Sequence, residues 1–243
     1  MKAFFKNLFD LILPSRCPYC GKVVEMENTL CSSCFEKIDF ISAPYCSICG
    51  MPFETEKQIY KTSALICPNC ARQKRNTRFN RSAILYDDFS KKAILAFKFQ
   101  NKCYHAKVFA KWLKLAGNDI FDAGVDLIIP VPLSYRRLFK RGYNQSVLLA
   151  RELSKLTGIE VDVTSLVKIK NTKAQSSLLG KNRLKNIKNA FAIKNTNKIK
   201  NKRIVLIDDV MTTGATLSEC AKILIRAGAK SVDTLTVART KKE

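Results

Sequence analysis

Eight of the ten cysteines stand in four Cys-x-x-Cys pairs, all within the first 70 residues. Two residues between thiolates allow one tight turn to present both sulfurs to the same metal ion, and two such turns complete a tetrahedral site. Zinc fits best, because it takes thiolate ligands and needs no redox chemistry. Four sulfur ligands leave no coordination position for a substrate, so we expect two structural zinc ions. The pairs are Cys17/Cys20, Cys31/Cys34, Cys46/Cys49 and Cys67/Cys70.

The sequence around the pairs bears on which of them share an ion. CPYCGK and CSICGM carry glycine directly after the second cysteine, whereas CSSCFE and CPNCAR do not. This repeat favours sequential pairing, in which the first two pairs bind one ion and the last two bind the other. A cross-braced arrangement stays open. Identical gaps without an export signal disfavour a secreted disulfide scaffold, and four pairs at this density disfavour redox dithiols.

The second candidate for chemistry is IVLIDDVMTTGAT, residues 204–216, where an apolar run meets two carboxylates and then small residues. Small residues at a helix N-terminus let backbone N–H groups reach a phosphate, and threonine hydroxyls add donors. Asp208 and Asp209 would repel that phosphate, so we expect them to hold sugar hydroxyls or Mg²⁺. A sugar phosphate satisfies both parts of the segment, with its hydroxyls at the acids and its phosphate at the small-residue turn. The segment lacks the glycine spacing of nucleoside-triphosphate and dinucleotide loops.

Alternating elements must position these residues. Continuous apolar strands between helical patterns predict an α/β fold, a mostly parallel sheet flanked by helices. Ligands bind such sheets at the carboxyl ends of the strands, where residues 208–216 would lie. We assign residues 1–80 to an N-terminal helix and a small double zinc-ribbon domain, and residues 81–243 to the α/β domain. Expected strands are 83–86, 126–132, 159–170, 190–194, 203–207 and 231–240; expected helices are 91–116, 146–158 and 217–227; expected loops are 134–145, which is basic, and 171–186.

Residues 204–216 resemble, at every position, the 5-phosphoribosyl-1-pyrophosphate (PRPP) loop of type I phosphoribosyltransferases. The resemblance implies that Asp208 and Asp209 hold the ribose hydroxyls, that the following loop holds the 5-phosphate, and that Mg²⁺ accompanies PRPP. An acid often replaces Thr212 in purine-salvage transferases, so a hypoxanthine- or guanine-type substrate is disfavoured. The loop residues are Thr212, Thr213, Gly214, Ala215 and Thr216.

From about residue 11 to the end, the double zinc ribbon and the segments after it resemble the ComF family of competence and DNA-uptake proteins. Within PVPLSYRRLFKRGYNQ, the residues Arg136, Arg137, Arg141 and Gln145 match a loop where transferases usually hold pyrophosphate and where DNA backbone could bind. Gln175 and Arg183 match a flexible loop that can close over the site. Lys168, Ala174 and Asn189 depart from the family pattern, and lysine in place of arginine loses bidentate phosphate contact. The resemblance identifies no catalytic residue.

The formal charge of +23 suggests a polyanionic partner, although lysine-rich drift in composition is an alternative cause. Residues 163–207 hold twelve basic residues and no acid. The leading hypothesis is a ComF-type accessory protein of DNA uptake that binds single-stranded DNA on the cytoplasmic side. The rivals are an active phosphoribosyltransferase with an unknown acceptor, and a structural protein that docks a DNA-uptake helicase or channel.

The N-terminal stretch MKAFFKNLFDLILP is too short and too interrupted by charge to span a bilayer. Its apolar residues fall largely on one side of a helix, which could pack on the protein, dock on a partner or lie on the inner face of the cell membrane. We therefore expect a cytoplasmic protein, with peripheral membrane contact as an alternative. His105, the single histidine, is expected at the surface, and Cys220 in the core.

Overall fold

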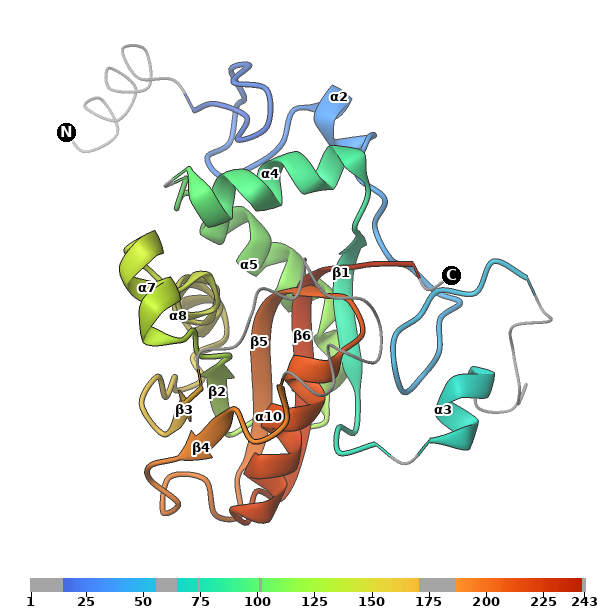
Figure 1. The fold of residues 1–243 in the computed structure, drawn as a ribbon. Helices are drawn as coiled ribbons and strands as arrows, with labels where there is room; N and C mark the ends of the chain where they lie inside the picture. Colours follow the sequence, from blue (N-terminus) through green and yellow to red (C-terminus); the bar gives the residue numbers. More distant parts are fainter. Residues whose placement is uncertain (1–14, 56–64, 74, 101, 171–186, 242–243) are drawn as a thin grey trace.

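A computed structural model describes residues 15–55, 65–73, 75–100, 102–170 and 187–241. Its centre is a four-stranded sheet in the order β1-β6-β5-β2, in which every neighbouring pair runs parallel. The carboxyl ends of all four strands therefore meet at one edge (Figure 1). The predicted parallel α/β sheet is confirmed. The strands are β1 (Asn80–Leu85), β2 (Leu127–Pro130), β5 (Arg203–Met211) and β6 (Ser231–Arg239).

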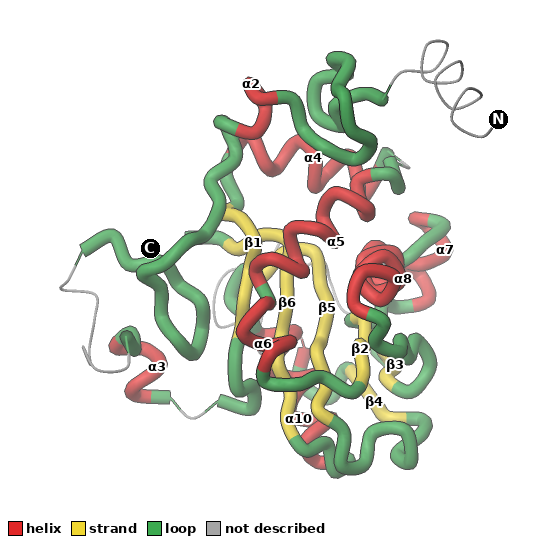
Figure 2. Tube along the Cα trace, turned by 180° about the vertical axis from the view of Figure 1, so that it is seen from behind, coloured by secondary structure: helices red, strands yellow, loops and turns green. Residues whose placement is uncertain are grey.

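Helices cover both faces of the sheet, which explains the unbroken apolar runs of its strands. Figure 2 shows α5 (His105–Ala116) and α8 (Gln145–Thr157) on one face, and Figure 1 shows α10 (Ala215–Arg226) on the other. Alternate strand residues face alternate sides: Ile128 packs in the α5/α8 core, whereas Ile129 packs in the α10 core. The remaining elements are α2 (Ser32–Phe35), α3 (Pro68–Arg72), α4 (Asp88–Phe99), α6 (Asn118–Asp122), α7 (Tyr135–Arg141) and an antiparallel pair, β3 (Leu166–Lys168) with β4 (Phe191–Ile193).

The helix predicted over residues 91–116 is two helices, α4 and α5. Asp87 starts α4 earlier than predicted, because its carboxylate accepts a 2.7 Å hydrogen bond from the Ser90 backbone while the Ser90 hydroxyl accepts one from the Asp87 backbone. Gln100 ends α4, and a turn at residues 103–104 leads into α5. This break lets α4 lie across the carboxyl edge of the sheet while α5 packs on its face.

The basic loop predicted at residues 134–145 folds mostly as the short helix α7. It ends at Gly142, whose φ of 76° is a left-handed conformation that favours glycine. Asn144 then caps α8 by accepting a hydrogen bond from the Ser146 backbone. Consecutive cap signals of this kind leave room for only one turn between the helices.

The first ribbon, residues 15–40, lies over α4 and α5. Its Tyr19 stacks on Phe89 with ring centroids 5.1 Å apart and meets the edge of His105 at 6.0 Å. His105 also stacks on Phe109 and is only 1% exposed, so the expected surface position is wrong. Burial lowers the pKa of His105 to about 4.

The second ribbon, described at residues 44–55 and 65–72, packs against the edge strand β1. The Asn80 backbone donates a 2.8 Å hydrogen bond to the Ile48 carbonyl, and Gly50 lies directly against the carbonyl of Asn80. The side chain of Arg81 donates to the Ser47 carbonyl at 2.8 Å. Backbone contacts therefore fix this ribbon to the sheet.

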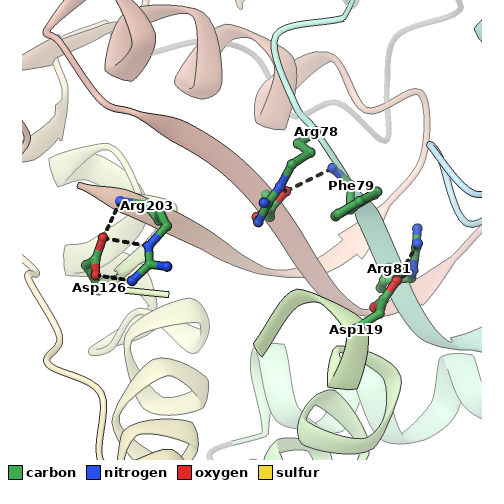
Figure 3. Close-up of polar contacts among 7 residues, drawn as sticks. Arg78, Phe79, Arg81, Asp119, Asp126 and Arg203 are labelled. Carbon is green, nitrogen blue, oxygen red and sulfur yellow. Dashed lines mark hydrogen bonds and ion pairs between the residues drawn. The ribbon is translucent and has the colours of Figure 1, made fainter. Parts of the chain in front are cut away.

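Three arginine–aspartate pairs join elements away from the carboxyl edge (Figure 3). One of them involves the buried Asp233 of β6, which also accepts a hydrogen bond from the Phe79 backbone at 2.9 Å. Each pair joins segments that are far apart in the sequence. The pairs are Arg78–Asp233 (2.6 Å), Arg81–Asp119 (2.5 Å) and Arg203–Asp126 (2.7 Å).

Several predictions concern residues outside the described part of the chain. These are the N-terminal helix, Ala174 of the polar segment, and the flexible-loop residues Gln175 and Arg183. In the part that the structure does describe, no helix is both long enough and apolar enough to cross a membrane.

Candidate functional site

The eight paired cysteines form two separate four-sulfur clusters. Within each cluster all sulfur atoms lie within 4.8 Å of one another. A tetrahedral zinc ion with bonds of about 2.3 Å needs sulfurs roughly 3.8 Å apart, so both clusters fit zinc. The pairing is sequential, and the cross-braced alternative is wrong. The clusters are Cys17, Cys20, Cys31 and Cys34, and Cys46, Cys49, Cys67 and Cys70.

The two kinds of cysteine pair have different local structures. After the glycine-bearing pairs, the Gly21 and Gly50 backbones donate to the carbonyls of Cys17 and Cys46, with φ of 76° and 65°. The plain pairs instead begin the short helices α2 and α3, with the first cysteine of each pair as N-cap. Each metal site thus combines one glycine knuckle with one helix start. Four thiolates fill the tetrahedron, so the zinc ions have a structural role.

Asp208 and Asp209 lie near the carboxyl end of β5. Asp208 is partly buried and accepts hydrogen bonds from the Ser146 hydroxyl at 3.0 Å and from the Asp209 backbone at 2.9 Å. Burial, together with the neighbouring charge of Asp209, raises the pKa of Asp208 to about 7. Asp209 pairs with the ammonium group of Lys98 at 2.8 Å. The two acids therefore have distinct environments: Asp208 accepts from a hydroxyl, whereas Asp209 pairs with an ammonium group.

The loop after the acids leads into α10. Gly214 takes the N-cap position with φ of 74°, and the helix begins at Ala215, two residues earlier than predicted. No side chain caps this end, and the Ala215 backbone has a long contact of 3.4 Å with the Thr213 hydroxyl. The first N–H groups of a helix have no partner inside it and attract anions. The turn can therefore hold a phosphate beside the acid pair.

The four residues matched to the pyrophosphate or DNA loop have different surroundings. Arg136 is exposed on α7, and Arg137 is half-buried, where burial and the charge of Arg141 lower its pKa. Arg141 places its guanidinium 4.6 Å from the ring centroid of Phe99. Gln145 is 1% exposed and accepts a hydrogen bond from Arg141 at 3.1 Å.

Gln145 also connects α8 to the end of α4. Its side-chain amide donates to the carbonyl of Lys98 at 3.1 Å, and the Tyr143 hydroxyl donates to the carbonyl of Phe97. These contacts fix the last turn of α4, which carries Lys98 toward Asp209. Gln145 thus supports the acid pair through the α4 backbone.

Sequence reasoning missed three residues of this edge. Lys98 and Ser146 contact the acid pair directly. Lys168, seen from the sequence only as a departure from a family pattern, is buried with its ammonium 5.3 Å from the ring centroid of Phe191. Burial lowers the pKa of Lys168 to about 8. The sequence signal for Lys98 is weak, because a lysine near the end of a helix is common.

Comparisons with known proteins agree with both parts of the architecture. The family described as double zinc ribbon domain matches residues 8–71, and the family described as phosphoribosyl transferase domain matches residues 140–243. Competence protein F of Haemophilus influenzae is 36% identical over 233 residues, which cover 92% of this chain and 96% of that protein.

Two further relatives match different shares of this chain. Competence protein ComFC of Bacillus subtilis is 29% identical over 225 residues, or 90% of this chain and 87% of that protein. DNA utilization protein YhgH of Escherichia coli is 37% identical over 115 residues, which span 47% of this chain and 50% of that protein. With its double zinc ribbon and phosphoribosyltransferase-type sheet, the chain belongs to the family of competence protein F.

Proposed function

We propose that this protein serves DNA uptake by binding single-stranded DNA across α7 and the end of α4, beside a ribose-phosphate site at residues 208–216. The names of the relatives, competence protein and DNA utilization protein, support the biological role. The exposed aromatic and basic side chains of this surface support the ligand.

The exposed aromatic side chains of α7 carry the proposal. Phe139 is 94% exposed and Tyr135, one helical turn earlier, is 76% exposed. A phenyl ring so exposed does not stabilise the fold, whereas single-stranded DNA stacks its bases on such rings. Arg136 and Lys140 are exposed on the same helix and supply positive charge for the phosphates.

A third ring extends this surface. Phe99, at the end of α4, is 61% exposed and lies under the guanidinium of Arg141. Arg141 of α7 lies against Phe99 and donates to Gln145, which in turn donates to the Lys98 carbonyl of α4, so the rings of α7 and α4 are presented by neighbouring elements. Exposed rings on two helices, with arginine and lysine side chains on the same elements, favour single strands, whose bases are accessible, over duplexes.

The ribose-phosphate part of the proposal depends on the acid pair and the turn before α10. Asp208 and Asp209 offer oxygen ligands suited to ribose hydroxyls or Mg²⁺, and the turn offers backbone N–H groups. Lys98 neutralises Asp209, so Mg²⁺ would displace its ammonium group. An active phosphoribosyltransferase is the second candidate function, favoured by this strand–loop–helix geometry.

DNA binding is tested by fluorescence anisotropy with labelled oligo-dT and a mixed sequence of equal length. The Tyr135→Ala/Phe139→Ala variant should bind about tenfold or more weakly. Phe35→Ala, which truncates a 55% exposed ring on the first ribbon, is the matched control and should bind as wild type does. Equal losses in both variants, or none in either, would contradict the stacking surface.

The electrostatic part is tested by the salt dependence of the same binding. The log–log slope should change by about 0.7 for each phosphate contact that is lost, so Arg136→Ala and Lys140→Ala together should flatten it measurably. Transferase activity is tested separately, by release of pyrophosphate from PRPP with Mg²⁺. Turnover that disappears in Asp209→Asn would establish the enzyme; absence of PRPP binding would remove the ribose-phosphate part and leave the DNA surface standing.

A further inference from the structure

A cavity of about 340 Å³ lies between the first ribbon and α4, away from the acid pair and from the turn before α10. Its volume falls in the range of roughly 300–1,000 Å³ that small-molecule sites occupy. The first ribbon forms one wall (Figure 1). Ala93 and Ala96 of α4 form the floor, and their short, nearly buried side chains leave the space open. The side chains in its lining that can contact a ligand are Tyr19, Phe89, Lys92, Gln100, Lys102 and His105.

Two polar atoms in this lining are buried and have no hydrogen-bond partner among the described residues. They are the Tyr19 hydroxyl, from the ribbon, and Nδ1 of His105, from the first turn of α5. The two rings meet edge to face, with centroids 6.0 Å apart. A buried polar group without a partner is unfavourable, because it has lost its water without replacement. Two such groups in the lining of one cavity indicate a polar ligand that the chain itself does not supply.

The rings around the cavity favour a planar ligand with a polar edge. Tyr19 and Phe89 stack with an interplanar angle of 17°, and His105 stacks on Phe109 behind them. His105 is 1% exposed, and burial lowers its pKa to about 4, so the imidazole is neutral at pH 7. A neutral imidazole has one donor and one acceptor nitrogen, and a phenol can also act as both. The edge of a heterocyclic base carries both donors and acceptors.

Charge divides the cavity into two sides. Lys92 and Lys102 lie on the helix side, and no carboxylate is among the described residues of the lining. Cys20 and Cys34 lie on the ribbon side and belong to the first zinc cluster. Thiolates repel an anion and accept hydrogen bonds from N–H groups. An anionic group of the ligand therefore belongs beside the lysines, and a base belongs on the ribbon side.

We propose that this cavity binds one nucleotide, with its base beside Tyr19 and His105 and its phosphate at Lys92 and Lys102. A nucleotide combines the planar ring, the polar edge and the negative charge that the lining selects. Two sources share this chemistry, a free mononucleotide and one nucleotide of a bound single strand. The second source rests on the proposed function, because Gln100 of the cavity directly follows Phe99 of the DNA-binding surface.

The test is isothermal titration of zinc-loaded, full-length protein with thymidine 5′-monophosphate. Tyr19→Phe removes the hydroxyl and keeps the ring on Phe89, and it should weaken binding about fivefold or more. Tyr104→Phe is the matched control: its ring also lies against His105, with centroids 4.6 Å apart, but it does not line the cavity. This control should bind the nucleotide as wild type does.

Stability and zinc content separate ligand binding from a structural role of the hydroxyl. Because the Tyr19 hydroxyl has no partner among the described residues, Tyr19→Phe should keep the melting temperature and both zinc ions. His105→Phe, which keeps a ring against Phe109, should also weaken binding and covers the case in which Tyr19→Phe loses zinc. If wild type does not bind the nucleotide at millimolar concentration, or if both variants bind it as wild type does, the proposal is wrong.

The phosphate position is tested by a second pair of variants. Lys92→Gln should weaken binding of thymidine 5′-monophosphate but not of thymidine, which lacks the phosphate. Lys91→Gln, an exposed lysine of α4 outside the lining, is the matched control and should bind both as wild type does. Equal effects of the two variants would contradict the assigned position of the phosphate.

Binding of labelled oligo-dT identifies the source of the nucleotide. If Tyr19→Phe weakens binding of both the oligonucleotide and the mononucleotide, the cavity holds a nucleotide of the strand; if it weakens only the mononucleotide, the cavity holds a free one. The Tyr135→Ala/Phe139→Ala variant should bind the mononucleotide as wild type does, since neither ring lines the cavity. Failure of the DNA-binding surface and failure of the cavity are thus distinguished.

Discussion

Replacing Asp208 by asparagine should stabilise the protein at and above neutral pH. In the folded protein the pKa of Asp208 is raised from 3.8 to about 7, first by burial and then by the charge of Asp209. Between these two values the folded chain keeps a proton that the unfolded chain has released. Stability from this group is therefore fully present below pH 3.8 and is lost as pH rises toward 7.

The size of the effect follows from the shift. A difference of about three pH units corresponds to roughly 4 kcal/mol at 1.36 kcal/mol per unit. Asparagine has nearly the same shape and its carbonyl can still accept from the Ser146 hydroxyl, so packing is kept. At pH 8 we expect Asp208→Asn to be more stable than wild type by about 2–4 kcal/mol, with little difference at pH 4.

Urea unfolding of both proteins from pH 4 to pH 8 measures this difference. Other groups also titrate: the pKa of His105, lowered to about 4 by burial, makes stability rise with pH up to its ordinary value near 6.5. That contribution is common to both proteins and cancels. Asp122→Asn, which changes an exposed carboxylate at the end of α6, should follow wild type. Parallel profiles for wild type and Asp208→Asn, or a variant less stable at pH 8, would refute the reasoning.

Three further changes test other parts of the structure. Gly50→Ala should lower the free energy of unfolding by about 1–3 kcal/mol in urea, because its φ of 65° and the adjacent β1 carbonyl leave no place for a methyl group; an unchanged value would mean that the second ribbon can shift freely. Cys46→Ser should reduce zinc from two ions per chain to one by elemental analysis, while Cys103→Ser, outside both clusters, should keep two. Lys98→Met should destabilise the protein at pH 7.5 by about 1–3 kcal/mol, since Asp209 loses its counter-ion; equal stability would show that water replaces the ammonium group.

The zinc sites were predictable because neighbouring residues in the sequence determine the turns that hold the sulfur ligands. Each Cys-x-x-Cys pair fixes its own turn, and the glycine that follows the second cysteine distinguishes the two kinds of turn. The strand–loop–helix at residues 203–226 is local in the same sense. Its strand runs four residues beyond the predicted end, because β6 continues to pair with it as far as Met211.

The surroundings of the acid pair depend on long-range packing that no local pattern encodes. Lys98 reaches Asp209 only because the chain turns after α4 and because Gln145 holds the end of that helix. His105 looked like a surface residue among lysines, but the first ribbon covers it with Tyr19. In each case a separate module supplies the burial or the partner, so sequence reasoning within one segment could not find it.

The two ribbons reach the carboxyl edge of the sheet by different routes. The first packs on α4, the helix that brings Lys98 to Asp209. The second holds Arg239 through the carbonyl of Cys49, beside the turn that begins α10. Each zinc cluster belongs to a ribbon that contacts a different part of this edge: the first ribbon packs on α4, which carries the partner of Asp209, and the second lies beside the turn that begins α10. Removal of one zinc ion should therefore disturb the part of the edge that its own ribbon contacts before it disturbs the other part. The strand pairing between the two parts does not depend on either metal.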